Sequence, residues 1–164
     1  MKHGLSSSKI LLIGIGNEFR EDDGLGLYIC RHDKIGRLQN LVIKENSGDG
    51  MTMMDAWKDE GTVVLIDAVR SGRAAGTIFH FDLLKDPLPP DLFNISTHNI
   101  GIPDCIILSE KLGLLPEKLI FYGVEGKNFG HGKKLSPVVK TAADILIDQI
   151  FADCESGNFR GLKV

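Results

Sequence analysis

The sequence predicts an α/β fold: a doubly wound, mostly parallel sheet with one antiparallel strand, in a single domain over residues 1–164. Two observations lead to this prediction. Short, continuously apolar runs alternate along the chain with longer amphipathic runs, which is the order of strands and helices in parallel crossover units. The run 62–66 (TVVLI) is also continuously apolar after Thr62 and rich in β-branched residues, as in a central strand that is buried on both faces.

The first half of the chain alternates strand and helix. Apolar residues are continuous in the predicted strands, and in the first predicted helix Leu25, Tyr28 and Ile29 fall on one face. The predicted elements, in chain order, are strand 9–15, helix 24–35, strand 41–44, helix 51–57 and strand 62–66.

The second half supplies the antiparallel strand. A strand over 77–83 follows the third predicted strand after only a short turn, so it should run antiparallel to it. Pro103 fits the first turn of one helix, and Ser136 and Pro137 fit the cap and first residue of another. The remaining predicted elements are helix 99–112, strand 118–122, a glycine-rich loop over 123–132 and helix 136–154.

Composition excludes several classes of protein. The net charge is −3 and no basic stripe is present, which argues against nucleic acid as a partner. No apolar stretch is long enough for membrane insertion, and we expect no signal peptide in the N-terminal residues, which lack an apolar core. The three cysteines are odd in number and widely spaced, so they predict neither a zinc knuckle nor a disulfide framework. We therefore expect a cytoplasmic protein.

The stretch that follows the first predicted strand, 14–26 (GIGNEFREDDGLG), combines glycines with acidic residues. Gly14 and Gly16 permit a tight turn and a close approach of the backbone. A dinucleotide-binding fingerprint would need a glycine where Phe19 stands, and the three successive acids at 21–23 would repel a diphosphate. The stretch is therefore better suited to a cation.

Polar groups follow the predicted strands at the edge where open α/β sheets bind ligands. They are the acids after the first strand, Asp67 at the end of the third, and His98 in a loop before a helix. Two carboxylates and an imidazole suit zinc, nickel or manganese and leave coordination positions open. Each group also has a structural interpretation: Asp22 or Asp23 as a helix cap, Asp67 as a partner of backbone amides, and His98 as an ordinary loop residue.

The motif Gly14-Ile15-Gly16-Asn17, followed by Asp22-Asp23-Gly24-Leu25-Gly26, resembles the opening signature of the hydrogenase maturation proteases. These endopeptidases trim the large subunit of nickel–iron hydrogenases. The similarity continues in the family's order over nearly the whole chain, at 66–68, 96–101, 123–125 and 135–137. The resemblance implies a three-layer domain with a twisted five-stranded sheet and helices on both faces.

The resemblance also implies a site and a reaction. Its metal ligands fall on Asp23, Asp67 and His98, which would recognise nickel that the substrate already carries; zinc or another divalent ion can substitute. The implied reaction removes the C-terminal extension of a hydrogenase large-subunit precursor once nickel has been inserted. That precursor is the expected partner, and the enzyme is expected to be a monomer or a weak dimer.

Alternatives remain open for both the role of the metal in the reaction and the functional class of the protein. The metal either polarises the scissile carbonyl or activates a water, with Asp22 or Glu125 as the catalytic base, or it only positions the peptide. Gly14, Gly16 and Asn17 are predicted to bind the substrate chain or its oxyanion. The alternative functions are a metal-dependent hydrolase with a resident ion and a non-catalytic metal-binding module.

Overall fold

The structure is a computed structural model that describes residues 9–92 and 100–159. Its strands and helices alternate for most of the chain, as the sequence predicts. In chain order they are β1 (Ile10–Ile15), the 3-10 helix η1 (Glu21–Gly24), α1 (Leu25–Cys30), α2 (Asp33–Gly36), β2 (Leu41–Asn46), α3 (Gly50–Trp57), β3 (Thr62–Val69), β4 (Ile78–Asp82), the 3-10 helix η2 (Pro90–Leu92), α4 (Ile102–Leu112), β5 (Lys118–Glu125) and α5 (Pro137–Ser156).

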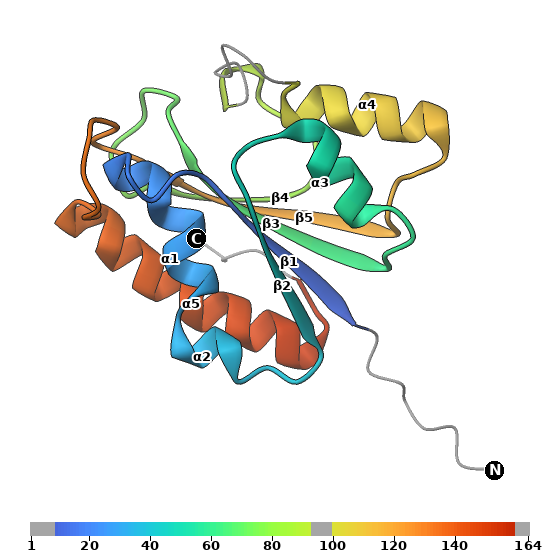
Figure 1. Cartoon of the computed structure of the whole chain (residues 1–164), viewed down its shortest axis with the longest axis horizontal. Coiled ribbons are helices and arrows are strands. Elements are labelled where there is room, and N and C mark those ends of the chain that lie inside the picture. The colour runs from blue at the N-terminus through green and yellow to red at the C-terminus, as the bar shows by residue number, and fades with distance from the viewer. Residues whose placement is uncertain (1–8, 93–99, 160–164) are drawn as a thin grey trace.

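The strands form one five-stranded sheet in the order β2-β1-β3-β5-β4. All neighbouring strands are parallel except β4, which pairs antiparallel with β5. Helices α1, α2 and α5 cover one face of the sheet, and α3 and α4 lie on the other (Figure 1). The predicted α/β class, the two helical layers and the single antiparallel strand are confirmed. The partner of β4 is β5 and not its predecessor β3, because β5 is inserted between them.

Side-chain alternation along the strands divides the core into two halves. Alternate residues such as Leu12, Val64 and Tyr122 pack with Leu25, Ile29 and the apolar face of α5. Residues of the opposite parity, such as Ile13, Leu65 and Phe121, pack with Trp57 and the other apolar residues of α3 and α4. Both faces of the central strands are therefore buried, which explains why 63–66 carries no polar residue.

Helix α1 lies unusually close to the sheet, and glycines permit this. A Cβ on Gly26 would stand 2.6 Å from the carbonyl oxygens of both Ile15 and Ile66. A Cβ on Gly14 would stand 2.6 Å from the Sγ of Cys30. Gly16 has a φ of 140°, and a Cβ there would overlap the carbonyl oxygen of Asp23. The close approach predicted for Gly14 and Gly16 is thus seen between β1 and the segment η1–α1.

Strands β2, β3 and β5 are longer than predicted. The pairing of β1 with β3 ends at Gly14 and Ile66, but β3 and β5 continue together, with Asp67 opposite Gly123 and Val69 opposite Glu125. Asp67 and Glu125 therefore lie within paired strands and not in loops. Hydropathy did not show this, because Asp67 and Gly123 interrupt the apolar runs, although Val69 and Val124 beyond them are buried.

The predicted helix 24–35 is divided into α1 and α2. The break falls at His32, which has an extended backbone and accepts a hydrogen bond through Nδ1 from the amide of Lys34 (3.2 Å). His32 therefore acts as the N-cap of α2. Helical spacing of the apolar residues is maintained through this break, which is why the sequence pattern did not reveal it.

The described ranges contain no helix with both the length and the apolarity that crossing a membrane requires. Cys30, Cys105 and Cys154 are buried free thiols. Burial raises the pKa of Cys105 to about 11, so this side chain is a neutral core residue at physiological pH.

We predict that Gly26→Ala lowers the free energy of unfolding by roughly 2–3 kcal/mol, because its methyl group would push α1 away from backbone atoms that cannot move aside. Gly36→Ala is the matched control, since a Cβ there meets no atom within 4 Å. It should leave stability unchanged or raise it by a few tenths of a kcal/mol. Urea denaturation followed by the fluorescence of Trp57, which is fully buried, measures both. Equal losses in the two variants would contradict this account of α1.

Candidate functional site

Asn17 shapes the turn that carries the acidic residues from β1 to η1. Its side-chain oxygen accepts a hydrogen bond from the amide of Phe19 (2.9 Å). Its own amide donates to Oδ2 of Asp23 (3.0 Å). Asn17 is therefore a local positioning residue for Asp23, and its predicted contact with substrate stays a prediction.

Asp23 and Asp67 come together at the carboxyl edge of the sheet. Asp67 is half-buried near the end of β3, and its pKa is raised well above the ordinary value, first by burial and then by the negative charge of Asp23. Burial also raises the pKa of Asp23, while Arg20 and the amide of Asn17 oppose the shift. The structure thus brings two of the three predicted ligands close enough for their charges to repel.

The third predicted ligand, His98, lies outside the described residues. Within 9–92 and 100–159, no group of three histidine, cysteine, aspartate or glutamate side chains could hold a metal ion. The chain is described again from Ile100, whose carbonyl oxygen would stand 2.9 Å from a Cβ on Gly50. Gly50 begins α3 shortly after the carboxyl end of β2, so Ile100 lies at the same edge of the sheet as Asp67.

Asp22 is fully buried and accepts hydrogen bonds from four donors. The amides of Lys127 and Asn128 donate to Oδ2, each at 2.8 Å. The amide of Ser136 donates to Oδ1 (2.7 Å), and its hydroxyl lies within hydrogen-bond distance of both oxygens (3.0 and 2.9 Å). Burial raises the pKa of Asp22, but these bonds lower it further, and the net result lies below the ordinary value.

These contacts favour a structural role for Asp22 over the base that the sequence suggested. A carboxylate with a lowered pKa and fully engaged oxygens accepts a proton poorly. Ser136 still begins α5, but its side chain makes no capping bond to the helix, because its hydroxyl is directed to Asp22. The carboxylate therefore joins η1 to the loop that precedes α5.

Glu125, the second predicted base, has a similar role at the end of β5. Its side chain is 2% exposed and accepts hydrogen bonds from the amides of Ser71 (2.8 Å) and Gly72 (2.9 Å). The hydroxyl of Ser71 donates to its other oxygen at 2.7 Å. Glu125 thus holds the turn that follows β3, and these bonds likewise favour a structural role.

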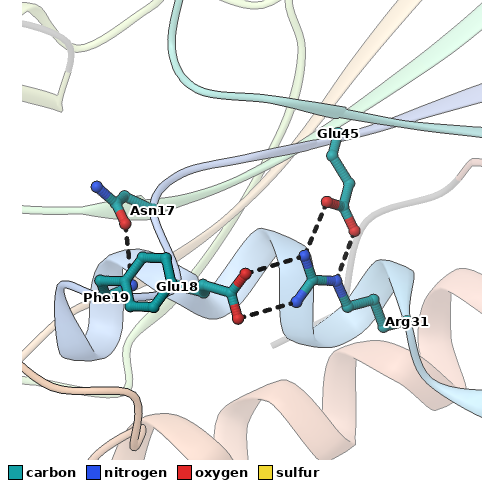
Figure 2. A network of polar contacts seen from close by, with 5 residues as sticks. All are labelled: Asn17, Glu18, Phe19, Arg31 and Glu45. Atoms are coloured by element: carbon teal, nitrogen blue, oxygen red, sulfur yellow. Dashed lines mark hydrogen bonds and ion pairs between the residues drawn. The ribbon is translucent and has the colours of Figure 1, made fainter.

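An arginine links the turn after β1 to the end of β2 through ion pairs with two glutamates. Figure 2 shows Arg31 between Glu45 and Glu18, with Nε and Nη2 donating to the two oxygens of Glu45 at 2.6 and 2.9 Å. Nη1 of Arg31 stands 3.2 Å from Glu18. The hydrogen bond from Arg31 lowers the pKa of Glu45. All three side chains are partly exposed, so each pair contributes no more than about 1 kcal/mol.

Sequence reasoning did not single out a group of cations beside this site. Arg70 and Arg73 follow β3, Lys127 follows β5, and together they line a pocket of about 450 Å³. Each stands a few residues beyond a predicted strand, at the edge where ligands were expected. Their position after predicted strands was the only clue in the sequence. Without knowing that β3 pairs with β5, this position did not show that the three cations lie together.

The family profile described as hydrogenase maturation protease (HycI) matches residues 34–153 of this chain. The chain belongs to the hydrogenase maturation protease family. It is similar to the hydrogenase 2 maturation protease of Escherichia coli K12, with 26% identity over 149 residues that cover 88% of this chain and 89% of the relative. The family is one of peptidases, and this chain is therefore a peptidase.

Solved structures agree with this membership. The chain is similar to an endopeptidase from Escherichia coli solved in solution, with a TM-score of 0.75 and 25% identity over 91% of this chain and 94% of that one. It also shares the fold of the hydrogenase maturating endopeptidase HybD from the same organism, with a TM-score of 0.69 and 21% identity over 91% and 94% of the two chains.

We predict that Asp22→Asn destabilises this maturation protease by about 2–4 kcal/mol at neutral pH. The side-chain NH2 group of asparagine is a donor, and it would face buried backbone amides that now donate to a carboxylate oxygen. Because the pKa of Asp22 is lowered in the fold, its contribution is present above the pKa of an unfolded aspartate, about 3.9, and is lost as the pH falls below it. Thermal melting of both proteins from pH 3 to pH 8 measures the difference.

Asp67→Asn should have the opposite effect. The pKa of Asp67 is raised in the fold, so the protonated form is favoured there, and stability is lost as the pH rises from about 3.9 through that raised pKa. Asparagine removes this titration, and the variant should melt higher than the parent at neutral pH, by about 2–4 °C for each kcal/mol regained. The gain should disappear near pH 3. A loss of stability like that of Asp22→Asn would contradict the repulsion between Asp23 and Asp67.

Proposed function

We propose that this peptidase removes the C-terminal extension of a nickel–iron hydrogenase large-subunit precursor after nickel has been inserted. Its acidic pair and His98 contact the nickel that the precursor carries. The metal is therefore part of the substrate, and the extension is cut only from a precursor that has been loaded. The proposed place of reaction is the cytoplasm.

The observation that carries this proposal is the pairing of Asp23 with Asp67. Burial raises the pKa of both half-buried carboxylates, and the charge of Asp23 raises that of Asp67 further, so the ionised pair destabilises the fold unless a cation lies between them. A divalent metal is the natural partner for such a pair, because it favours the ionised form of both groups. Two protein carboxylates also leave most of the coordination sphere open to ligands from the substrate.

The course of the chain supports His98 as the third ligand. Asp67 has the same parity in β3 as Leu65 and Val69, whose side chains face α3 and α4. The chain re-enters the described structure at Ile100 and leads directly into α4, beside the start of α3. Ile100, two residues after His98, thus lies on the face of the sheet toward which Asp67 points.

The roles we assign to Asp22 and Glu125 are structural. Each holds a loop at the site through several hydrogen bonds, and neither has a free oxygen for a proton. The nickel therefore positions the peptide and polarises its scissile carbonyl without help from these two carboxylates. Gly14 and Gly16 allow the turn to lie close to Asp23. Asn17 fixes the carboxylate of Asp23 through its backbone amide.

The test compares nickel-loaded and nickel-free precursor of the large subunit encoded with this protein, with cleavage read as a loss of mass. We expect cleavage of the loaded precursor alone. Asp23→Asn, Asp67→Asn and His98→Ala should each lower the rate at least 100-fold, because each removes a ligand. Asp55→Asn is the matched control, since Asp55 is an exposed residue of α3 that pairs with Lys58. Equal cleavage of the nickel-free precursor would contradict the proposal.

Metal analysis of the purified enzyme separates the alternative functions. Under the proposal the enzyme alone retains no stoichiometric metal. A tightly held zinc ion, with activity that chelation removes, would indicate a hydrolase with a resident ion. Binding of the precursor without cleavage under any metal loading would indicate a non-catalytic module.

A further inference from the structure

The pocket beside the acidic pair has the opposite charge. Its lining contains Arg70, Arg73 and Lys127 against a single carboxylate, that of Glu125. Glu125 is buried and its charge is already shared among the two amides and one hydroxyl of the turn after β3. The exposed surface of the pocket is therefore electropositive, although the whole chain has a net charge of −3.

Two of the cations are available for a ligand. Among the described residues, neither Arg70 nor Lys127 has an ion-pair partner, whereas Arg73 is paired with Asp91 at 3.0 Å. The guanidinium of Arg70 lies over the ring of Phe129, 5.6 Å from its centroid. This contact limits the freedom of Arg70 without neutralising its charge, so the side chain is held ready for an anion.

Both walls of the pocket are fixed from behind by buried carboxylates. Glu125 holds the turn with Arg70 and Arg73, and Nη1 of Arg73 also donates to the hydroxyl of Ser71 (3.0 Å). Asp22 holds the opposite wall through the amide of Lys127. The pocket therefore keeps its shape without a ligand, and little ordering is needed when one binds.

We propose that this pocket binds a carboxylate of the segment that the peptidase cleaves off, supplied by an acidic side chain or by the C-terminus of the precursor. Arginine forms paired hydrogen bonds with a carboxylate, and a lysine adds a second positive charge. The inference rests on the proposed function, since it names a subsite for that substrate. Arg70 and Lys127 are its specificity-determining residues.

The geometry limits where that carboxylate stands in the substrate. Arg70 follows Asp67 by three residues of nearly extended chain, so their Cα atoms are at most about 11 Å apart. An extended peptide covers the same distance in about three residues. A carboxylate held by Arg70 thus lies within a few residues of a peptide bond placed at the acidic pair.

A titration tests the pocket without cleavage. The probes are N-acetyl-trialanine with a free C-terminus, the same peptide as its C-terminal amide, and N-acetyl-Ala-Asp-Ala-amide. We expect at least one carboxylate peptide to shift the amide NMR signals of Gly72, Gly126 and Lys127 in a saturable way, and the neutral amide to shift none. The double variant Arg70→Gln/Lys127→Gln should weaken binding at least tenfold. Arg37→Gln/Lys118→Gln removes the same charges at exposed positions outside the pocket and should change nothing.

Cleavage of nickel-loaded precursor identifies the source of the carboxylate. Neutralising the acidic side chains of the extension should raise KM if a side chain binds, and adding Gly-Ser to the C-terminus should raise KM if the terminal carboxylate binds. The double variant should raise KM about tenfold while kcat changes little.

The outcomes separate the two proposals. Two results would overturn the carboxylate subsite and leave the proposed function standing. One is that the neutral amide binds as tightly as the acidic peptides. The other is that KM is unchanged in every arm while the parent enzyme still cleaves. Failure of the parent enzyme to cleave loaded precursor overturns the proposed function. The peptide titration then still decides whether the pocket binds carboxylates.

Discussion

The buried carboxylate of Asp22 is the contact on which the carboxyl edge of this sheet depends. It has no exposed surface and no ion-pair partner among residues 9–92 and 100–159, and it is held by amides and a hydroxyl from the segment between β5 and α5. An ionised group in such a position is stable only while all of these donors are in place. The turn after β1 and the loop before α5 therefore form together, and this fixes Asp23.

Adjacent acids in the chain thus have opposite energetic roles. Asp22 stabilises the fold because its charge is fully satisfied, whereas Asp23 is placed near Asp67, where like charges repel. A chain selected only for stability would replace one member of that pair with an amide. Keeping both acids is explained by the cation that they are proposed to meet, since unfavourable ionisation at a site is a common sign of function.

The order and faces of the elements could be predicted from the sequence, because they depend on apolar periodicity, which is local. The gathering of Asp23 and Asp67 could also be predicted, because parallel strands end at one edge of the sheet. The sequence could not distinguish Asp22 from Asp23 by role, since this depends on donors at 127–136 that are more than 100 residues away. For the same reason it did not show that Glu125 belongs to a strand or that Arg70 and Lys127 face one pocket.

Two features of opposite charge lie at this edge of the sheet: the acidic pair, and the pocket lined by Arg70, Arg73 and Lys127. The acidic pair is the proposed site for the metal, and a few residues beyond it, after the end of β3, Arg70 and Arg73 belong to the proposed site for a carboxylate. The screening length at physiological ionic strength, about 8 Å, is similar to this separation, so each feature acts mainly on the group beside it. Under both proposals, a substrate with its metal before the cut and its carboxylate beyond it would fit in one orientation only. The same two buried carboxylates, Asp22 and Glu125, hold the loops on both sides, so the fold itself fixes the spacing between the two proposed sites.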